Sequence, residues 1–407
     1  RMIAAQDAAQ IRKKNRGTEA AAQARKQRNV INAQAREDWV GWLAGTMLRR
    51  VHTETGFRER VVAFWSDHFT AHGKRGVVRR ATTPYIDDAI RPHIAGRFID
   101  VLEAAVMHPL MLDYLDQARS VGPNSGMALR RKGDAGLNEN LAREVLELHT
   151  LGVGGPYGQG DVTELAELFT GMTFEARNGY KFRKDFVEPG PETVLGATYA
   201  DAYNDKPVRE VLVALAAHPA TARHIATKLA VHFVSDTPDP GLIDALEASY
   251  LATDGALMPL YETLLGHASA WDATLANFKP PIDFVSSAMR ALAVPSDALE
   301  QMTERQVRNI LNKPLVVMGQ EWERPIGPDG WPEEDPHWVT PQGLAGRVTW
   351  AMSVPERVLG TVPDPRGFVD VALGTYANDA VRFAAGAAES KPEAIGLVLM
   401  SPAFQRR

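Results

Sequence analysis

The chain has no cysteine among its 407 residues. Disulfide bonds, thiolate catalysis and cysteine-ligated zinc or iron–sulfur sites are therefore excluded, so any metal must bind to His, Asp, Glu or neutral oxygen ligands. No run approaches about 18 consecutive apolar residues, and the sequence therefore predicts no membrane span. The formal net charge at pH 7 is only −5. This balance excludes a globally basic protein, and we expect no nucleic-acid partner.

The residues that are present indicate a folded helical protein. Hydrophobic residues make up 45% of the chain and charged residues 23%, which is typical of globular proteins with a large core. Apolar residues recur at helical spacing over most of the chain. In residues 173–200, aromatic residues, Thr and Val instead alternate with polar residues. The prediction is an all-α fold, with a single multi-helical domain over 39–407 and a small β-hairpin insert near 173–200.

Residues 1–38 form a separate basic segment. Nine basic residues stand against three acidic ones within residues 1–37. Ala, Gln, Arg and Lys are strong helix formers, and the segment has few large apolar residues. It is predicted to be an N-terminal helical arm, which is either solvated or in contact with an anionic surface.

The densest polar segment is residues 138–149. On a helix, Asn140, Arg143, Glu144 and Glu147 share one face. Two glutamates one turn apart are candidates for a general acid/base pair or for holding a divalent metal, with Arg143 steering an anionic group and Asn140 contacting substrate. The alternative is that Arg143 and Glu147 are an ordinary i,i+4 ion pair on a solvated face.

Histidines provide the second set of candidates. His68 and His72 are four residues apart in a helix predicted over 57–69, a spacing that metals use, and His68 is the one we expect to join the glutamates. The alternative is a core or capping role. His149 is a candidate substrate contact, although on an ideal helix it points away from Glu147 and meets it only if the helix ends first.

Two further side chains are candidates for substrate binding. Lys228 lies between His224 and His232 at i, i+4, i+8 spacing on a predicted helix. This cationic stripe suits binding of an anionic substrate, and the alternative is that the three residues form a solvent-facing polar stripe. Trp331 lies in a Gly-Trp-Pro turn of the long loop 321–341. Such a turn can expose an indole to a sugar, a base or a peptide, or it can anchor the loop to the helices.

The order of several motifs carries a family resemblance. These motifs are Phe64-Trp65-Ser66-Asp67-His68-Phe69-Thr70, His108-Pro109, Asn138-Glu139-Asn140-Leu141-Ala142-Arg143-Glu144, Leu146-Glu147-Leu148-His149-Thr150-Leu151-Gly152, His218-Pro219-Ala220-Thr221-Ala222, Met318-Gly319-Gln320 and Gly330-Trp331. Taken in order, they resemble the bacterial domain-of-unknown-function 1800 (DUF1800) family. We expect the resemblance to leave about the first 40 residues outside. Family members often carry His before the Glu-Pro-Gly run and a basic residue after Gly-Pro, where this chain has Val187 and Glu192.

The resemblance implies an exported protein, since family members are mostly exported and many are encoded beside a sulfatase-like family. We therefore expect a periplasmic or secreted location, a polymeric substrate such as a polysaccharide, and a sulfatase-like partner protein. Because the chain begins at Arg1, we also expect that an upstream segment has been removed.

Two functions remain open from the sequence. The first is a hydrolase or lyase in which Glu144 and Glu147 act as acid and base, or hold a divalent metal with His68. The second is a non-catalytic scaffold or binding protein, in which the Asn-Glu-Arg cluster is a buried network that fixes helix packing.

Overall fold

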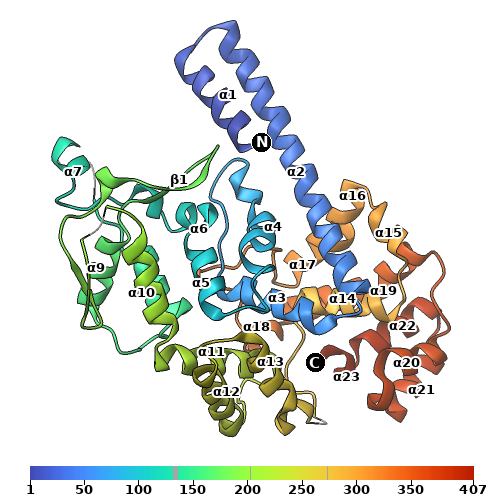
Figure 1. The fold of residues 1–407 in the computed structure, drawn as a ribbon. Helices are drawn as coiled ribbons and strands as arrows, with labels where there is room; N and C mark the ends of the chain where they lie inside the picture. Colours follow the sequence, from blue (N-terminus) through green and yellow to red (C-terminus); the bar gives the residue numbers. More distant parts are fainter. Residues whose placement is uncertain (132–135, 202, 273) are drawn as a thin grey trace.

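The apolar residues of the chain collect in two hydrophobic cores. In a computed structural model, which describes residues 1–131, 136–201, 203–272 and 274–407, the first core contains residues between Val61 and Leu264. The second core combines Val40, Leu43, Met47 and Val51 with residues from Phe284 onward. Figure 1 shows the corresponding two groups of helices side by side.

The N-terminal arm is a pair of packed helices, α1 (Met2–Lys14) and α2 (Glu19–His52). It extends away from the rest of the molecule (Figure 1). Helix α2 begins after Thr18, whose hydroxyl accepts a hydrogen bond from the Ala21 amide, as an N-cap residue does. The helical arm is confirmed, but α2 runs without interruption from the arm into the second core. The predicted division after residue 38 therefore lies within a helix.

The first core is built from short helices. They are α3 (Gly56–His68), η1 (Val78–Arg80), α4 (Thr82–Tyr85), η2 (Ile86–Ile90), α5 (Phe98–Val106), α6 (Pro109–Tyr114), η3 (Gln117–Arg119), α7 (Gly126–Arg131), α8 (Asn140–Glu144), η4 (Val145–His149), α9 (Gln159–Leu168), α10 (Lys206–Ala216), α11 (Pro219–Phe233), α12 (Pro240–Ala252), α13 (Leu257–Gly266) and η6 (Ala268–Trp271). Three prolines at helix starts, in α6, α11 and α12, follow His or Asp residues that cap the first turn.

The β insert consists of two antiparallel hairpins. Strand β1 (Met172–Glu175) pairs with β2 (Gly179–Phe182), and β3 (Glu192–Val194) pairs with β4 (Ala197–Tyr199), with η5 (Lys184–Phe186) between them. The insert near 173–200 and the all-α class are therefore confirmed for the part of the chain that the structure describes.

The second core is built from the C-terminal helices. They are α14 (Pro281–Ala291), α15 (Ser296–Glu300), α16 (Glu304–Gln306), η7 (Val307–Asn312), α17 (Lys313–Val317), α18 (Asp335–Trp338), α19 (Pro341–Leu359), α20 (Pro365–Leu373), η8 (Gly374–Tyr376), α21 (Asp379–Ala387), α22 (Lys391–Met400) and α23 (Pro402–Gln405). None of the helices described for the chain is both long enough and apolar enough to span a membrane.

Candidate active site

The candidate site begins at a change of helix type. Helix α8 continues directly into η4, a π-helix, and π-turns inside helices are frequent at functional sites. The carbonyl oxygens of Leu148 and His149 at its end have no partner within the helix. They accept hydrogen bonds from Nε2 of His224 at 3.0 Å and Nε2 of His68 at 3.2 Å. Segments from three parts of the chain are joined in this way.

The three imidazoles of His68, His149 and His224 lie close together. The ring centroid of His68 is 6.0 Å from that of His149 and 6.1 Å from that of His224. Burial lowers the pKa of His68 well below its usual value, that of His149 to about 3 and that of His224 to about 4, and the positive charge of Lys228 adds to each effect. All three rings are therefore neutral at pH 7.

The neutral rings leave unused nitrogen atoms inside the protein. A carbonyl oxygen can only accept, so Nε2 of His68 carries the proton and its Nδ1 presents a lone pair. Among the described residues, Nδ1 of His68 and Nδ1 of His149 are both buried without a hydrogen-bond partner. Unpartnered buried polar atoms of this kind are uncommon in proteins.

Asp67, next to His68 at the end of α3, is fixed by the loop that carries Trp331. The Asp67 Oδ1 atom accepts the Trp331 amide at 2.8 Å. Gly330 has φ +86°, and a Cβ there would lie 2.5 Å from Asp67 Oδ2, so only glycine allows this close approach. Burial raises the pKa of Asp67 to about 7, and the negative charges of Glu333 and Asp329 add to this rise. The hydrogen bond from the Trp331 amide and the positive charge of Lys228 act to lower the pKa.

Glu333, in the same loop, has the opposite shift. His232 Nδ1 donates a hydrogen bond to Glu333 Oε1 at 2.6 Å, and the Arg407 guanidinium lies 3.8 Å from Oε2. Burial acts to raise the pKa of Glu333, but His232, Arg407 and Lys228 outweigh it and lower the pKa. Glu333 is therefore ionised at neutral pH, while Asp67 is half protonated.

Lys228 on α11 lies between these acids and the imidazoles. Burial lowers its pKa, while the negative charges of Asp67, Glu333 and Asp329 oppose that change. Among the described residues, it has no acidic partner within 4.0 Å. A largely buried amine without a close ion pair is unusual in a structural role and is typical of functional sites.

Asp67 and Glu333 both line a cavity of about 180 Å³ between the two cores. Its walls come from α2, α3 and α4 on one side and from α14 and the loop 320–338 on the other. Trp331 and His232 also line it. The cavity brings groups from distant parts of the sequence to one accessible space.

Comparison with known protein families gives one clear result. The family model described as "Protein of unknown function (DUF1800)" matches residues 1–406. The chain belongs to the DUF1800 family. We found no match among curated proteins or among solved structures.

The extent of the match corrects one expectation. From the motifs we expect the DUF1800 resemblance to cover the chain only from about residue 41 onward. The family match instead starts at residue 1. The reason is visible in the fold, because α2 carries the arm and also supplies apolar residues to the second core. The basic arm is therefore part of the family pattern.

The predicted glutamates differ in their surroundings. Arg143 contacts Glu139 at 3.2 Å and Glu147 at 3.5 Å, and it also donates to Gln159. Burial raises the pKa of Glu144 to about 7, with the negative charges of Glu147 and Asp329 adding to this, although Arg143 opposes it. Glu147 is therefore the glutamate that forms an ion pair with Arg143. Glu144 is the glutamate that is partly protonated near pH 7.

The other predicted site residues divide into two groups. Trp331 and Lys228 act on Asp67, and His149 lies beside His68, the residue next to Asp67. Asn140 is exposed, and its backbone amide donates to Asn138 Oδ1 at the start of α8. Its side chain has no hydrogen bond with another described residue.

The histidine pair expected for a metal does not form. Helix α3 ends at His68, so His72 lies beyond it, with its ring 4.5 Å from that of Tyr114. Among described residues, one group of three potential ligands has its atoms within 4.8 Å of each other, and it does not contain His68. The set His68, Glu144 and Glu147 is therefore not gathered at metal-ligand spacing.

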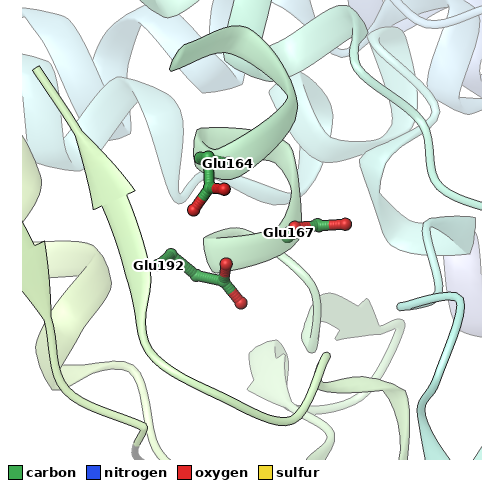
Figure 2. Close-up of side chains that lie close together, drawn as sticks. All are labelled: Glu164, Glu167 and Glu192. Atoms are coloured by element: carbon green, nitrogen blue, oxygen red, sulfur yellow. The ribbon is translucent and has the colours of Figure 1, made fainter. Parts of the chain in front are cut away.

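That group of three is Glu164 and Glu167 on α9 with Glu192 on β3 (Figure 2). Glu192 is 7% exposed. Burial raises its pKa to about 8, with the negative charges of Glu167 and Glu164 adding to this. Three carboxylates this close repel one another when all are ionised. A hard cation such as Ca²⁺ or Mg²⁺, which prefers carboxylate oxygens, or a shared proton would relieve that repulsion. The cluster involves Glu192, a position where the resemblance leads us to expect a basic residue.

Sequence reasoning missed the acids of the long loop. Asp329 and Glu333 influence the pKa values of Asp67 and Lys228, and Glu333 lines the cavity. The sequence did contain an indication of these acids. Asp329 precedes and Glu333 follows the turn around Trp331, in a loop rich in Gly and Pro, and loops often carry functional residues. What the sequence could not show is that this loop folds back onto α3.

Proposed function

We propose that this DUF1800 chain is a hydrolase that uses Asp67 as general acid and Glu333 as general base. One observation carries the proposal: both carboxyl groups line the same cavity, and their neighbours shift their pKa values in opposite directions. Two carboxyl groups with separated pKa values are the arrangement by which enzymes assign acid and base roles.

The reaction follows from these states. Asp67 in its protonated form donates its proton to the leaving oxygen of the scissile bond as the bond to carbon breaks. Glu333 accepts a proton from a water molecule, whose oxygen forms the new bond to that carbon. His232 donates to Glu333 and orients it, and Lys228 tunes the acidity of Asp67. A lyase would use the base on a carbon-bound proton instead, and product analysis distinguishes the two.

The substrate we propose is a polymer of the cell envelope or the extracellular space, with the chain in the periplasm or secreted. The cavity supports a polymer with flat apolar faces, such as a polysaccharide, because Trp331 lines it. A chain without cysteine is also compatible with an oxidising compartment.

The test measures release of reducing ends from a panel of polysaccharides. We expect Asp67→Asn and Glu333→Gln each to reduce kcat by about 10²–10⁴-fold, the usual contribution of acid–base catalysis. The matched control is Glu334→Gln, which changes the exposed neighbour of Glu333. Glu144→Gln tests the pair expected from the sequence. Equal activity of Asp67→Asn and the wild type would remove the assignment.

A scaffold remains the second candidate, because one observation favours it. His68 and His224 both donate to consecutive carbonyls of η4, which ties α3 and α11 to that segment. Under this alternative, His68→Phe lowers the melting temperature, and no polymer in the panel is cleaved by the wild type.

A further inference from the structure

The cavity contains an arginine that the proposed mechanism does not use. Arg60 lies on α3 and lines the cavity. Its Nε and Nη2 atoms are buried and have no hydrogen-bond partner among the described residues. Its guanidinium carbon stands 4.7 Å from the centre of the Phe233 ring, which fixes the plane of the group.

The charged groups that act most strongly on Arg60 pair with one another. Arg50 and Arg407 both pair with Asp283, and Arg407 also approaches Glu333. Asp283 and Glu333 both have lowered pKa values and are ionised. Both carboxylates thus have other cationic partners, and among the described residues no carboxylate oxygen lies within 4.0 Å of Arg60.

Arg60 therefore carries a charge that has no ion-pair partner. Burial and the neighbouring Arg407 lower its pKa only to about 10, so it stays protonated at pH 7. A buried charge without a partner is unfavourable, and an anion bound in the cavity would offset that cost. A guanidinium fork matches the plane of a carboxylate through two parallel hydrogen bonds.

The other walls of the cavity suit a sugar ring. Trp331 contributes aromatic surface, and the buried Trp338, with its ring centroid 5.9 Å from that of Trp331, supports it. Ser66 and Thr70 donate their hydroxyl protons to the backbone at 2.6 and 2.8 Å, so their oxygen lone pairs remain for the hydroxyl groups of a ligand. The space of about 180 Å³ is part of an open cavity, so neighbouring units of a chain can extend beyond it.

We propose that Arg60 binds the carboxylate of a uronic acid unit in this cavity. The inference rests on the proposed function, because it names the class of polymer as one that carries sugar carboxylates. Arg60 and Asp67 are seven residues apart on one helix face, about 10.5 Å along the axis. The carboxylate therefore belongs to a unit next to the one whose bond faces Asp67, and Arg60 determines specificity.

The experiment measures binding without turnover. We expect D-glucuronate to raise the melting temperature of the wild type and to bind in calorimetry, while D-glucose and the methyl ester of glucuronic acid do neither. Arg60→Gln should weaken glucuronate binding by at least about tenfold, the loss of a charge-assisted hydrogen bond. Arg58→Gln is the matched control, since Arg58 is exposed on the same helix.

Each outcome decides a different question. The comparison of glucuronate with its ester needs no variant, so it holds even if Arg60→Gln does not fold. Equal responses to the acid and the ester, or unchanged binding by a folded Arg60→Gln, overturn the inference. A chain that binds glucuronate but cleaves no polymer contradicts only the proposed function. A chain that cleaves neutral polymers and does not bind glucuronate contradicts only this inference.

Discussion

At the scale of single residues, two buried carboxyl groups have pKa shifts in opposite directions because their neighbours differ. Burial, helped by the negative charges of Glu333 and Asp329, raises the pKa of Asp67 to about 7, although the Trp331 amide and Lys228 oppose it. Glu333 receives the His232 proton and faces Arg407 and Lys228, so its pKa falls. Burial acts on both, and the specific partners decide the sign. The position of Lys228 near both acids makes it the residue whose removal should be most informative.

The residue-scale prediction concerns Lys228→Gln and the pH dependence of kcat/KM. Asp67 acts only when protonated, so wild-type activity should fall as the pH rises through about 7. The positive charge of Lys228 lowers the pKa of Asp67, so its removal raises that pKa and moves the alkaline limb to higher pH. Lys206→Gln, which removes an exposed lysine on α10, is the control. An alkaline limb that stays in place in Lys228→Gln would contradict the role given to this lysine.

At the scale of elements, the turn geometry of η4 decides where His149 points. On an ideal α-helix over 138–151, the spacing alone would point the His149 side chain away from that of Glu147. The π-turn widens the helix there, and His149 becomes 1% exposed with its carbonyl bonded to His68. Thr150 supports the turn, since its hydroxyl donates to the Val145 carbonyl at 2.6 Å.

Local pattern explains which parts of the fold were predictable. The apolar face of α3 and the alternation in β1 are periodic signals that depend on neighbours in sequence, and both elements formed near the predicted bounds. The end of α3 at His68 and the π-turn depend on tertiary packing, which has no periodic signal. The candidate site was predicted in part, because Lys228 and His68 stand out by spacing, whereas Glu333 becomes relevant only when its loop folds onto α3.

The element-scale prediction concerns the contact between α9 and β3. The pKa of Glu192 is about 8 in the folded protein against an ordinary 4.5, so the folded state holds this proton more tightly than the unfolded chain. Its contribution to stability is therefore complete below about pH 4.5 and is lost as the pH rises through about 8. We expect Glu192→Gln to raise the melting temperature relative to wild type at pH 8.5 and much less at pH 5.

The measurement is thermal unfolding followed by circular dichroism in EDTA, so that no divalent cation neutralises the three carboxylates. Glu262→Gln, a change of an exposed glutamate on α13, serves as the control. The same difference between variant and wild type at both pH values would show that Glu192 does not hold a proton in the folded state.

At the scale of the whole molecule, the cavity marks the junction of the two cores. Helix α2 passes from the arm into the second core, and α3 begins the first core only four residues after α2 ends. Within the second core, Asp283 on α14 accepts a hydrogen bond from Arg50 Nη1 of α2 at 2.6 Å and also pairs with Arg407, and the positive charge of Arg60 on α3 acts on it from across the junction. These contacts hold the cavity walls together, so the stability of the junction and the shape of the site depend on the same carboxylate.

The whole-molecule prediction is the effect of Asp283→Asn. The cations Arg407, Arg50 and Arg60 outweigh burial and hold the pKa of Asp283 well below its ordinary range, so the acid is ionised and stabilising at pH 7. Its removal leaves several buried guanidinium groups without their anion, and we expect the free energy of unfolding in urea to fall by about 3–5 kcal/mol. The control is Asp370→Asn, because Asp370 pairs with Arg382 at an exposed site, where an ion pair contributes little. If both variants lost the same small amount of stability, Asp283 would not stabilise this wall of the cavity. If Asp283→Asn alone also abolished glucuronate binding, the wall and the anion site would be one structural unit.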